Sequence, residues 1–349
     1  MKIFVVIPHK YAGCGFYRQY QPHNDLAKKG IDVLLGAGLF NDDGFAIDAD
    51  IIQWHKGYFD LHGMREANKR GIITVVDFDD WWRVDTEHVL YDNYLKGGIT
   101  DIITEILTLA DYATVTTERL AVEARKFNRN VVVLPNAMEP VKSQRIDEDK
   151  LVFGYIGGYC HGKDVEMLRG LNNKLSGDYK FRLMGYDGSP VYDQYVKILS
   201  DDGRKLEHFD WVEKADIWHY HNLYNFMDVS LVPLVDNKFN SLKSELKLIE
   251  AGFFKKAVIC SNVHPYKALL KHKVNAFVVN KPADWYKGCK FFIDNPAAVQ
   301  DFGEALYETV QPYHIDEVNK KRLKFYEDVL KKRDINSSIG HSRLQGVNG

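Results

Sequence analysis

LVPLVDNKFNSLKSELKLIEAGFFKKAVICSN, residues 231–262, holds two short apolar runs on either side of an amphipathic segment. The first run is the end of Asp228–Pro233, which begins just before the quoted stretch, and the second is Ala257–Cys260. Both have the length and composition of buried strands, whereas Ser244–Phe253 has helical periodicity. A strand, a helix and a second strand in this order join two parallel strands of one sheet, with the helix on its face. The stretch therefore predicts an α/β fold.

The same alternation continues in both directions along the chain. Before this stretch we expect strands at Ile3–Ile7, Asp32–Leu35, Ile51–Trp54, Ile72–Val76, Ala113–Thr116, Val131–Leu134, Val152–Ile156, Phe181–Met184 and Leu206–Phe209, and after it a strand at Ala276–Val279. The expected helices run up to Lys29, over Leu61–Lys69, Thr100–Leu109 and Glu118–Phe127, from Asp164, and over Ala283–Ile293, Ala297–Val310 and Ile315–Leu330. This order is typical of parallel sheets covered by helices on both faces.

The length and one polar segment indicate two domains. The chain has 349 residues, and a domain usually has about 100–200. Residues 139–150 are polar and divide the pattern, so we expect a first domain over 1–138, a linker over 139–150 and a second domain over 151–314. A charged helix over 315–332 and a flexible tail over 333–349 complete the chain.

Composition and charge narrow the class of protein. Apolar residues make up 45% of the chain, charged residues 27%, and the net charge is -2. Proteins that bind nucleic acid non-specifically usually have an excess of basic over acidic residues, and this chain does not. The cysteines, Cys14, Cys160, Cys260 and Cys289, are widely spaced and match no zinc pattern, which favours free thiols. Without a signal peptide or a membrane-length apolar run, we expect a cytoplasmic protein.

Two glycine loops follow predicted strands and open predicted helices, at Gly13–Gly15 and at Gly157–Lys163. Glycine lets the backbone approach a ligand, and a helix N-terminus offers free N–H groups and a positive dipole end to an anion. Lys163 adds a full positive charge, which suits a diphosphate. The dinucleotide fingerprint needs a glycine where Arg18 stands, so the first loop is not an NAD site. The alternative for either loop is a tight turn that starts a helix.

Three charged residues share one face of the helix predicted in residues 231–262. Lys243, Lys247 and Glu250 are spaced i, i+4 and i+7, while Leu246 and Ile249 point to the core. Two cations near the helix start and a carboxylate one turn later suit a phosphate and the sugar hydroxyls beside it. The alternative is an ordinary solvated face of paired charges.

The segment Asp77–Trp82, DFDDWW, ends a predicted strand. Ligands of open α/β sheets bind outside the carboxyl ends of strands. Asp79 and Asp80 could bind sugar hydroxyls or act as a base, and adjacent tryptophans suit stacking on a carbohydrate. No histidine or further carboxylate lies nearby in sequence, so we expect no metal site. The alternative is a helix cap with aromatic residues that belong to the core.

Taken in order, these features resemble the retaining GT-B glycosyltransferases of the large glycogen-synthase-like family four, over residues 1–330. The strongest likeness is residues 231–262, while GCGFYR, VLPNAMEP and FGYIGG resemble the family's first glycine loop, interdomain exit and second phosphate loop. The family implies two Rossmann-like domains facing each other across a cleft, with a C-terminal helix that returns to the first domain. It also implies transfer of a sugar from a nucleotide-diphosphate sugar to an acceptor hydroxyl, with retention and without a metal or other cofactor.

The resemblance implies roles for individual residues. Glu250 matches the glutamate that bonds the donor ribose, and Lys163 and Lys247 match lysines that stabilise charge on the departing diphosphate. Asp79 and Asp80, which we take as catalytic, lie where the family has a first-domain histidine. The other candidate donor-binding residues are Gly13, Gly15, Gly157, His161, Trp211, Val212, Lys243 and Ser244. The chain departs from the family at Leu242, where a second glutamate is expected, and at Gly158, where an arginine is usual.

A fainter likeness connects the GCG loop and the Leu-Ile-Glu-Ala-Gly helix with phage DNA α-glucosyltransferases. It implies a hydroxymethylated DNA base as acceptor, although the chain lacks a basic excess. Because Leu242 interrupts the paired-glutamate motif, a non-catalytic nucleotide-sugar-binding protein is a further alternative. The expected partners are therefore a nucleotide-sugar donor and a carbohydrate, lipid-linked or nucleic-acid acceptor.

Overall fold

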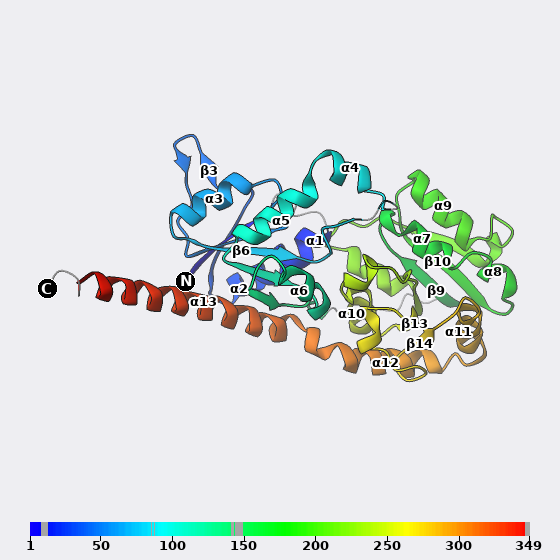
Figure 1. Cartoon of the computed structure of the whole chain (residues 1–349). Helices are drawn as coiled ribbons and strands as arrows, with labels where there is room; N and C mark the ends of the chain where they lie inside the picture. The colour runs from blue at the N-terminus through cyan, green and yellow to red at the C-terminus, as the bar shows by residue number, and fades with distance from the viewer. Residues whose placement is uncertain (8–12, 85, 87, 141–142, 144–148, 346–349) are drawn as a thin grey trace. The chain divides into compact units, whose positions relative to one another are not determined.

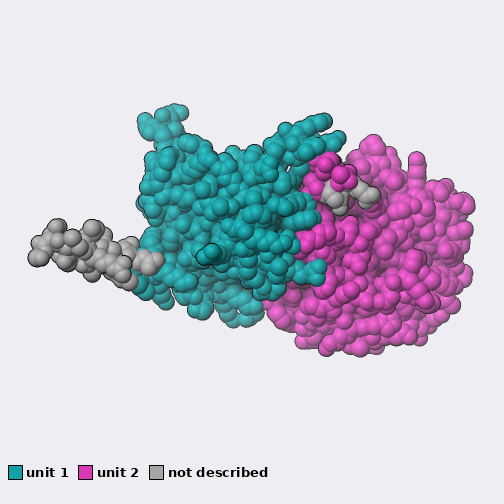
Figure 2. Space-filling view, viewed as in Figure 1, with its two compact units in different colours: residues 1–83, 92–137, 315–349 teal, residues 84–91, 138–314 magenta. Residues whose placement is uncertain are grey.

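The computed structural model describes residues 1–7, 13–84, 86, 88–140, 143 and 149–345, and only the helical backbone of 336–345. The chain forms two compact units, which Figure 2 distinguishes by colour. Unit 1 comprises residues 1–83, 92–137 and 315–349, and unit 2 comprises 84–91 and 138–314. Most of the predicted linker, 141–142 and 144–148, lies outside the described residues, as does 346–349 at the chain end.

Unit 1 is built on a parallel sheet of six strands in the order β2-β1-β5-β6-β7-β8. The strands are β1 Lys2–Val6, β2 Asp32–Gly36, β5 Ile51–His55, β6 Ile73–Phe78, β7 Tyr112–Val115 and β8 Val131–Val133. The central strand β6 is buried along its whole length, as expected for a parallel strand covered on both faces. A short hairpin, β3 Phe40–Asn41 with β4 Gly44–Phe45, stands apart from the sheet (Figure 1).

The helices of unit 1 lie on both faces of its sheet (Figure 1). They are α1 Gly13–Gly15, α2 Gln21–Lys28, α3 Leu61–Lys69, α4 Tyr91–Lys96, α5 Ile99–Leu109, α6 Glu118–Ala124 and α13 Ile315–Gln345, with a π-helical turn at Phe16–Tyr20. Leu26 of α2 and Phe325 of α13 share one apolar core with Ile3 and Val5 of β1. Helix α13 is also bonded to α2, because the Asn319 side-chain amide donates to the backbone carbonyl of Pro22.

Helix α13 is longer than the sequence predicts. We expect a helix over 315–332 and a flexible tail over 333–349, yet the helix continues to Gln345. Residues 333–345 contain no proline, the residue that most strongly ends a helix, so nothing in the sequence forces the predicted stop. None of the described helices has the length and apolar run that a membrane crossing requires.

Unit 2 repeats the same plan with a second six-stranded parallel sheet, in the order β11-β10-β9-β12-β13-β14. Its strands are β9 Leu151–Ile156, β10 Tyr179–Tyr186, β11 Phe209–Glu213, β12 Val229–Val232, β13 Ala257–Ser261 and β14 Phe277–Val279. Its helices are α7 Gly162–Glu166, α8 Leu171–Lys174, α9 Pro190–Leu199, α10 Leu246–Phe253, α11 Ala283–Asp294 and α12 Ala298–Val310. Two apolar cores lie on the two faces of this sheet, because neighbouring residues such as Val152 and Phe153 of β9 belong to different cores.

Three local predictions in unit 2 need correction. The strand expected at Leu206–Phe209 is a 3-10 turn over Leu206–His208, and β11 begins only at Phe209. Helix α10 begins at Leu246 instead of Ser244, because the backbone of Lys243 is extended. Lys243 therefore does not lie on the helix face that the i, i+4, i+7 spacing predicted. Helix α9 has no counterpart in the sequence prediction.

Candidate functional site

The glycine loop of unit 2 follows β9 and is held by two tyrosines of α9. The Tyr192 hydroxyl donates to the Gly157 carbonyl over 3.0 Å, and the Tyr195 hydroxyl donates to the Gly158 carbonyl over 3.1 Å. These bonds fix the orientation of two consecutive peptide groups. A side chain at Gly157 is excluded, because a Cβ atom there would lie 2.4 Å from the Tyr155 hydroxyl oxygen. The loop thus needs glycine for space.

The ammonium group of Lys247 lies beside this loop and has no hydrogen-bond partner among the described residues. A Cβ atom on Gly157 would lie 3.1 Å from its Nζ, and the centroid of the Tyr155 ring is 5.1 Å from it. Burial lowers the pKa of Lys247, although Asp164 opposes the shift. The buried Tyr155 hydroxyl also lacks a partner within the described residues. A buried cation and a buried hydroxyl without partners suit a bound anion.

His161 belongs to the same loop and is neutral at pH 7. Burial lowers its pKa to about 3, and the charge of Lys247 contributes. Its Nδ1 lies 2.7 Å from Asp164 Oδ2, and the other carboxylate oxygen of Asp164 accepts the backbone N–H of Val235 over 2.8 Å. A neutral imidazole that donates through Nδ1–H keeps Nε2 as an acceptor. His161 can therefore accept a hydrogen bond from a hydroxyl, but it supplies no charge for a phosphate.

Glu250 lies one turn after Lys247 on α10 and is 2% exposed. Its Oε2 accepts a hydrogen bond from the Tyr224 hydroxyl over 3.0 Å. Lys243 precedes the helix, yet its charge lowers the pKa of both Lys247 and His161, so it acts at the same place. The structure thus brings together four predicted residues around the loop that begins at Gly157, although not by the helical spacing that we expected.

Two of the predicted donor-binding residues form part of a strand. Trp211 and Val212 belong to β11, where successive side chains point to opposite faces. Trp211 is 46% exposed, and its ring packs against Tyr186 with centroids 5.3 Å apart. Val212 is partly buried against the apolar core of unit 2. Trp211 is therefore free to stack on a ligand, whereas Val212 is a packing residue.

The remaining predicted donor residues of unit 2 adjoin the same loop and helix in sequence. Lys163 is the second residue of α7, and Ser244 lies between the extended Lys243 and the start of α10. Leu242, which stands where the family has a glutamate, is 1% exposed and apolar. A contact that the family makes through that carboxylate cannot be made by this side chain.

In unit 1, Asp77 lies at the centre of a buried polar network. Asp77 is 0% exposed and Arg18 is 1% exposed. The guanidinium of Arg18 donates two hydrogen bonds to the Asp77 carboxylate, over 2.9 and 2.6 Å, and the Thr114 hydroxyl donates a third over 2.6 Å. Burial raises the pKa of Asp77, but Arg18 and His55 lower it well below its usual range. Asp77 is therefore ionised at neutral pH, and both of its carboxylate oxygens accept hydrogen bonds.

Asp79 lies at the mouth of this network, between two cations. Lys56 Nζ is 2.9 Å from Asp79 Oδ1, and His55 Nε2 is 3.4 Å from the same oxygen. The other ring nitrogen of His55 lies 3.2 Å from Asp77. Burial lowers the pKa of His55, but the two aspartates raise it well above 6.5. Lys56 and His55 in turn hold the pKa of Asp79 well below 3.8 despite its burial.

The structure corrects the interpretation of Trp82 and adds neighbours of Asp79 that come from another strand. Trp82 is buried against Phe78 and Phe127, with its indole nitrogen bonded to Thr104, so it belongs to the core and cannot stack on a sugar. No histidine lies close to Asp79 in sequence, but His55 lies close to it in space, because neighbouring parallel strands end at the same edge of the sheet. That adjacency of β5 and β6 was the signal that could have revealed His55 and Lys56.

The first glycine loop is described only from Gly13 onward. Residues 8–12, which lead from the end of β1 into this loop, lie outside the described residues. A Cβ atom on Gly13 would meet no atom of the described residues within 4 Å, and Gly15 has a right-handed helical backbone with φ −61°. Neither position therefore needs glycine for its own backbone, which leaves ligand approach as a reason for it. Cys14, between them, lies close to His55 and Asp79.

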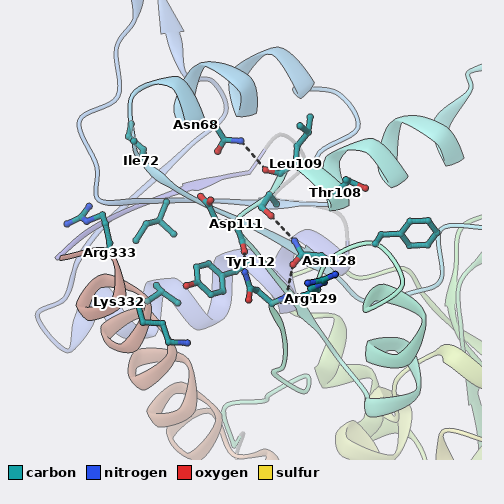
Figure 3. A pocket seen from close by; sticks show the side chains of 16 residues that line it. Asn68, Ile72, Thr108, Leu109, Asp111, Tyr112, Asn128, Arg129, Lys332 and Arg333 are labelled. Atoms are coloured by element: carbon teal, nitrogen blue, oxygen red, sulfur yellow. Dashed lines mark hydrogen bonds between the residues drawn. The ribbon is translucent and has the colours of Figure 1, made fainter. Parts of the chain in front are cut away.

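A pocket of about 630 Å³ lies at the other end of the unit 1 sheet (Figure 3). It adjoins Ile73 and Tyr112, the first residues of β6 and β7, whereas Asp79 follows the last residue of β6. Two of its polar side chains are bonded within the protein, Asn68 to the Leu109 carbonyl and Asn128 to the Ala110 carbonyl. The pocket is thus separate from the candidate residues.

The chain shares its fold with solved glycosyltransferases. Sucrose-phosphate synthase (tll1590) from Thermosynechococcus elongatus has a TM-score of 0.74 at 15% identity, covering 95% of this chain and 100% of that chain. A glycosyltransferase from Rickettsia africae ESF-5 has a TM-score of 0.68 at 14% identity, with 95% and 98% covered. Anabaena Alr3699/HepE in complex with UDP-glucose has a TM-score of 0.68 at 12% identity, with 94% and 100% covered.

These likenesses establish the fold. No protein-family model matches the chain, and no curated protein matches it in sequence. The similar structures are GT-B glycosyltransferases, and the two parallel sheets of this chain match their Rossmann-like domains. The predicted fold class, GT-B with two Rossmann-like domains, is confirmed.

Proposed function

We propose that this chain is a glycosyltransferase that moves a sugar from a nucleotide-diphosphate sugar to an acceptor hydroxyl. The observation that carries the proposal is the ammonium of Lys247, which lies against the glycine loop of unit 2 and has no hydrogen-bond partner in the part of the chain that the structure describes. Burying an unpaired ammonium costs several kcal/mol, so such a group is retained where a ligand supplies the opposite charge. A diphosphate in a GT-B fold is the ligand that fits.

The donor diphosphate binds at the loop that begins at Gly157. Lys247 and Lys243 supply positive charge there, and the Tyr155 hydroxyl supplies a further donor. Glu250 accepts hydrogen bonds from the ribose, and the exposed Trp211 ring offers a surface for the base. Two structurally similar proteins, Anabaena HepE and TarM from S. aureus, were solved in complex with UDP, which supports a uridine nucleotide as the first donor to test.

The same cations account for catalysis. Negative charge grows on the leaving phosphate as the sugar–oxygen bond breaks, and Lys247 and Lys163 stabilise that charge. Because these ammonium groups do what a divalent cation does in other enzymes, transfer needs no metal or other cofactor. The retaining outcome follows from the family resemblance alone.

The acceptor binds at the carboxyl end of the unit 1 sheet. Asp79 is ionised there and lies between Lys56 and His55, so it can accept a hydrogen bond from an incoming hydroxyl. A carboxylate with so low a pKa is a poor base, so its role is to orient the acceptor more than to remove its proton. A carbohydrate, lipid-linked or nucleic-acid hydroxyl meets this requirement.

A ligand screen followed by a turnover assay tests the proposal. UDP-, GDP- and ADP-glucose are compared by thermal unfolding of the full chain, since a ligand at about 100 times its Kd adds about 2.7 kcal/mol of stability. We expect one nucleotide series to stabilise the protein and its sugar to be released slowly to water. Stabilisation without release of nucleoside diphosphate, with or without acceptors, would instead identify a binding protein. No stabilisation by any of the three would contradict the proposal.

A further inference from the structure

A thiol, an imidazole and a carboxylate meet at one end of the unit 1 sheet. Ligand atoms of Cys14, His55 and Asp79 all lie within 4.8 Å of one another. The three residues come from α1, from the last position of β5 and from the position after β6. They are therefore far apart in sequence and are brought together by the parallel sheet. Its strands β5 and β6 are buried along almost their whole length.

The surroundings of His55 match those of a metal-binding histidine. Such a histidine usually donates its second ring N–H to a carboxylate, which fixes the tautomer and aims the other nitrogen at the metal. Here Nδ1 of His55 lies 3.2 Å from Asp77, and Asp77 is itself held by Arg18 and Thr114. Nε2 of His55 is left facing Asp79 and has no hydrogen-bond partner within the described residues. The supporting shell of a metal site is thus already built.

The donor set and its dimensions favour zinc. Sulfur, imidazole nitrogen and carboxylate oxygen are all zinc ligands, with bonds of about 2.0–2.3 Å that put neighbouring donors roughly 3.3–3.8 Å apart. The distance of 3.4 Å between His55 Nε2 and Asp79 Oδ1 lies in this range. Cys14 would need to approach by at most about 1.5 Å, given that donor spacing and the 4.8 Å limit. Three protein ligands leave a fourth position open.

Lys56 occupies the place of a competing cation. Its Nζ lies 2.9 Å from Asp79 Oδ1, the oxygen that a metal would use. The Lys56 side chain is 17% exposed, so it can swing toward solvent when a dication takes its place. Zinc binding releases the thiol proton of Cys14 and the proton of His55 to solvent. One dication then replaces two protons, and the total charge of the cluster does not change.

We propose that Cys14, His55 and Asp79 form a zinc site that competes with Lys56 for the Asp79 carboxylate. Zinc and the Lys56 ammonium cannot share one carboxylate oxygen without strong repulsion, so binding separates Lys56 from Asp79. The site is distinct from the donor residues of unit 2, and its existence does not depend on the proposed function. If Asp79 orients the acceptor, zinc is an inhibitor that chelation reverses.

Cobalt and zinc titrations of the full chain test this site. Co²⁺ bound to a thiolate shows a charge-transfer band in the near ultraviolet, so the band reports Cys14 directly and needs no activity. We expect the band in wild type and in Cys160→Ser, which removes the exposed cysteine as a matched control. We expect no band in Cys14→Ser, and a zinc affinity lowered by more than the roughly 10–100-fold that loss of an outer-shell partner costs.

Lys56→Met provides the second arm, because it removes the competing cation and is expected to tighten zinc binding. Equal zinc affinities of wild type and Cys14→Ser would overturn the site, and so would a band that disappears in Cys160→Ser instead. An unchanged or weaker affinity in Lys56→Met would overturn the competition. A cobalt band with no effect of zinc on sugar transfer would leave the site in place and remove Asp79 from the proposed transfer mechanism.

Discussion

The two units place charge at the carboxyl ends of their sheets in opposite ways. In unit 1 the cations Arg18 and Lys56 each lie within 3 Å of a carboxylate oxygen, on Asp77 and on Asp79. In unit 2 the ammonium of Lys247 has no hydrogen-bond partner within the described residues. The Lys247 Nζ atom is itself buried, so exposure to solvent does not explain its lack of a hydrogen-bond partner there.

The charges of unit 1 are therefore paired within the protein, whereas the Lys247 ammonium of unit 2 still needs an anion from a ligand. Paired charges stabilise one another and keep their ionisation states, which suits residues that orient a neutral hydroxyl. An unpaired buried cation is unfavourable on its own and becomes favourable when an anion arrives. Unit 1 is therefore expected to be stable and poorly responsive to nucleotides, and unit 2 to gain most from a bound diphosphate.

Breaking the buried ion pair between Arg18 and Asp77 is expected to have the largest effect, a loss of folding stability. Arg18→Met removes the main partner of the buried Asp77 carboxylate and leaves it only His55 and Thr114 among the described residues. Breaking a buried pair in this way costs about 3–5 kcal/mol. Chemical denaturation of wild type and variant measures this loss. Arg125→Met is the control, because Arg125 pairs with Glu118 at the surface, where such a pair contributes about 0–1 kcal/mol. Equal losses in the two variants would show that the buried pair is not special.

The ribose contact comes next. Hydrogen bonds to a charged group contribute about 1.5–3 kcal/mol, so Glu250→Ala is expected to weaken nucleoside diphosphate binding by roughly 10–150-fold. Tyr224→Phe removes the protein's own hydrogen bond to that carboxylate and leaves the carboxylate in place. Calorimetric titration of both variants should show a large loss for the first and a small one for the second. If Tyr224→Phe is as damaging as Glu250→Ala, the carboxylate acts on the fold and not on the ligand.

The stability of the two units is expected to depend on pH in opposite ways, because each unit has one histidine with a shifted pKa. The pKa of His161 falls to about 3 on folding, so the unfolded chain takes up a proton below pH 6.5 that the folded chain does not, and stability decreases as the pH falls. The pKa of His55 is raised well above 6.5, so its contribution is complete below pH 6.5 and is lost as the pH rises through the raised pKa. His161→Gln should reduce acid sensitivity by about 1.4 kcal/mol per affected pH unit.

The control for this prediction is His55→Gln, which should destabilise the protein more at acidic than at alkaline pH. Unfolding free energies at several pH values measure both variants against wild type. A wild-type stability profile that neither substitution changes would mean that the two histidines do not differ in protonation.

The smallest expected effect concerns the tyrosines that hold the glycine loop. Tyr195→Phe removes the hydrogen bond to the Gly158 carbonyl, a contribution of about 0.5–1.5 kcal/mol. Because the loop has to adopt one conformation around the diphosphate, the same change should lower nucleotide affinity as well as stability. Tyr186→Phe, which removes an exposed bond to Asp193, is the matched control. Identical nucleotide affinity in wild type, Tyr195→Phe and Tyr186→Phe would show that the hydrogen bond from α9 does not contribute to nucleotide binding.

The sequence reveals the fold more completely than the site. Buried parallel strands such as β6 and β12 are short apolar runs whose order along the chain implies the sheet. The helix start at Leu246 was missed because the extended backbone of Lys243 depends on tertiary contacts and not on helical spacing. Trp82 was misassigned for a similar reason, since an aromatic residue beside a carboxylate has the same sequence in a core or at a surface.

The sequence did not reveal which residues complete each cluster, because they lie far apart along the chain. His55 lies 22 residues before Asp77, and they meet because β5 and β6 pair in parallel. Tyr192 and Tyr195 reach the glycine loop from α9, 35 and 37 residues away. Local motifs identified the loop and the charged helix, whereas hydrogen-bond partners from other elements required the folded structure.

The most direct test of the central claim is nucleotide binding by Lys247→Met. UDP, GDP and ADP are titrated calorimetrically into wild type, Lys247→Met and Lys255→Met, the last being a surface lysine paired with Glu304. We predict that Lys247→Met folds at least as stably as wild type, because a buried unpaired ammonium is removed. We also predict that its affinity for the preferred nucleoside diphosphate falls by roughly 10–150-fold, while Lys255→Met binds like wild type. Unchanged affinity in a folded Lys247→Met protein would contradict the assignment of this ammonium to the donor diphosphate.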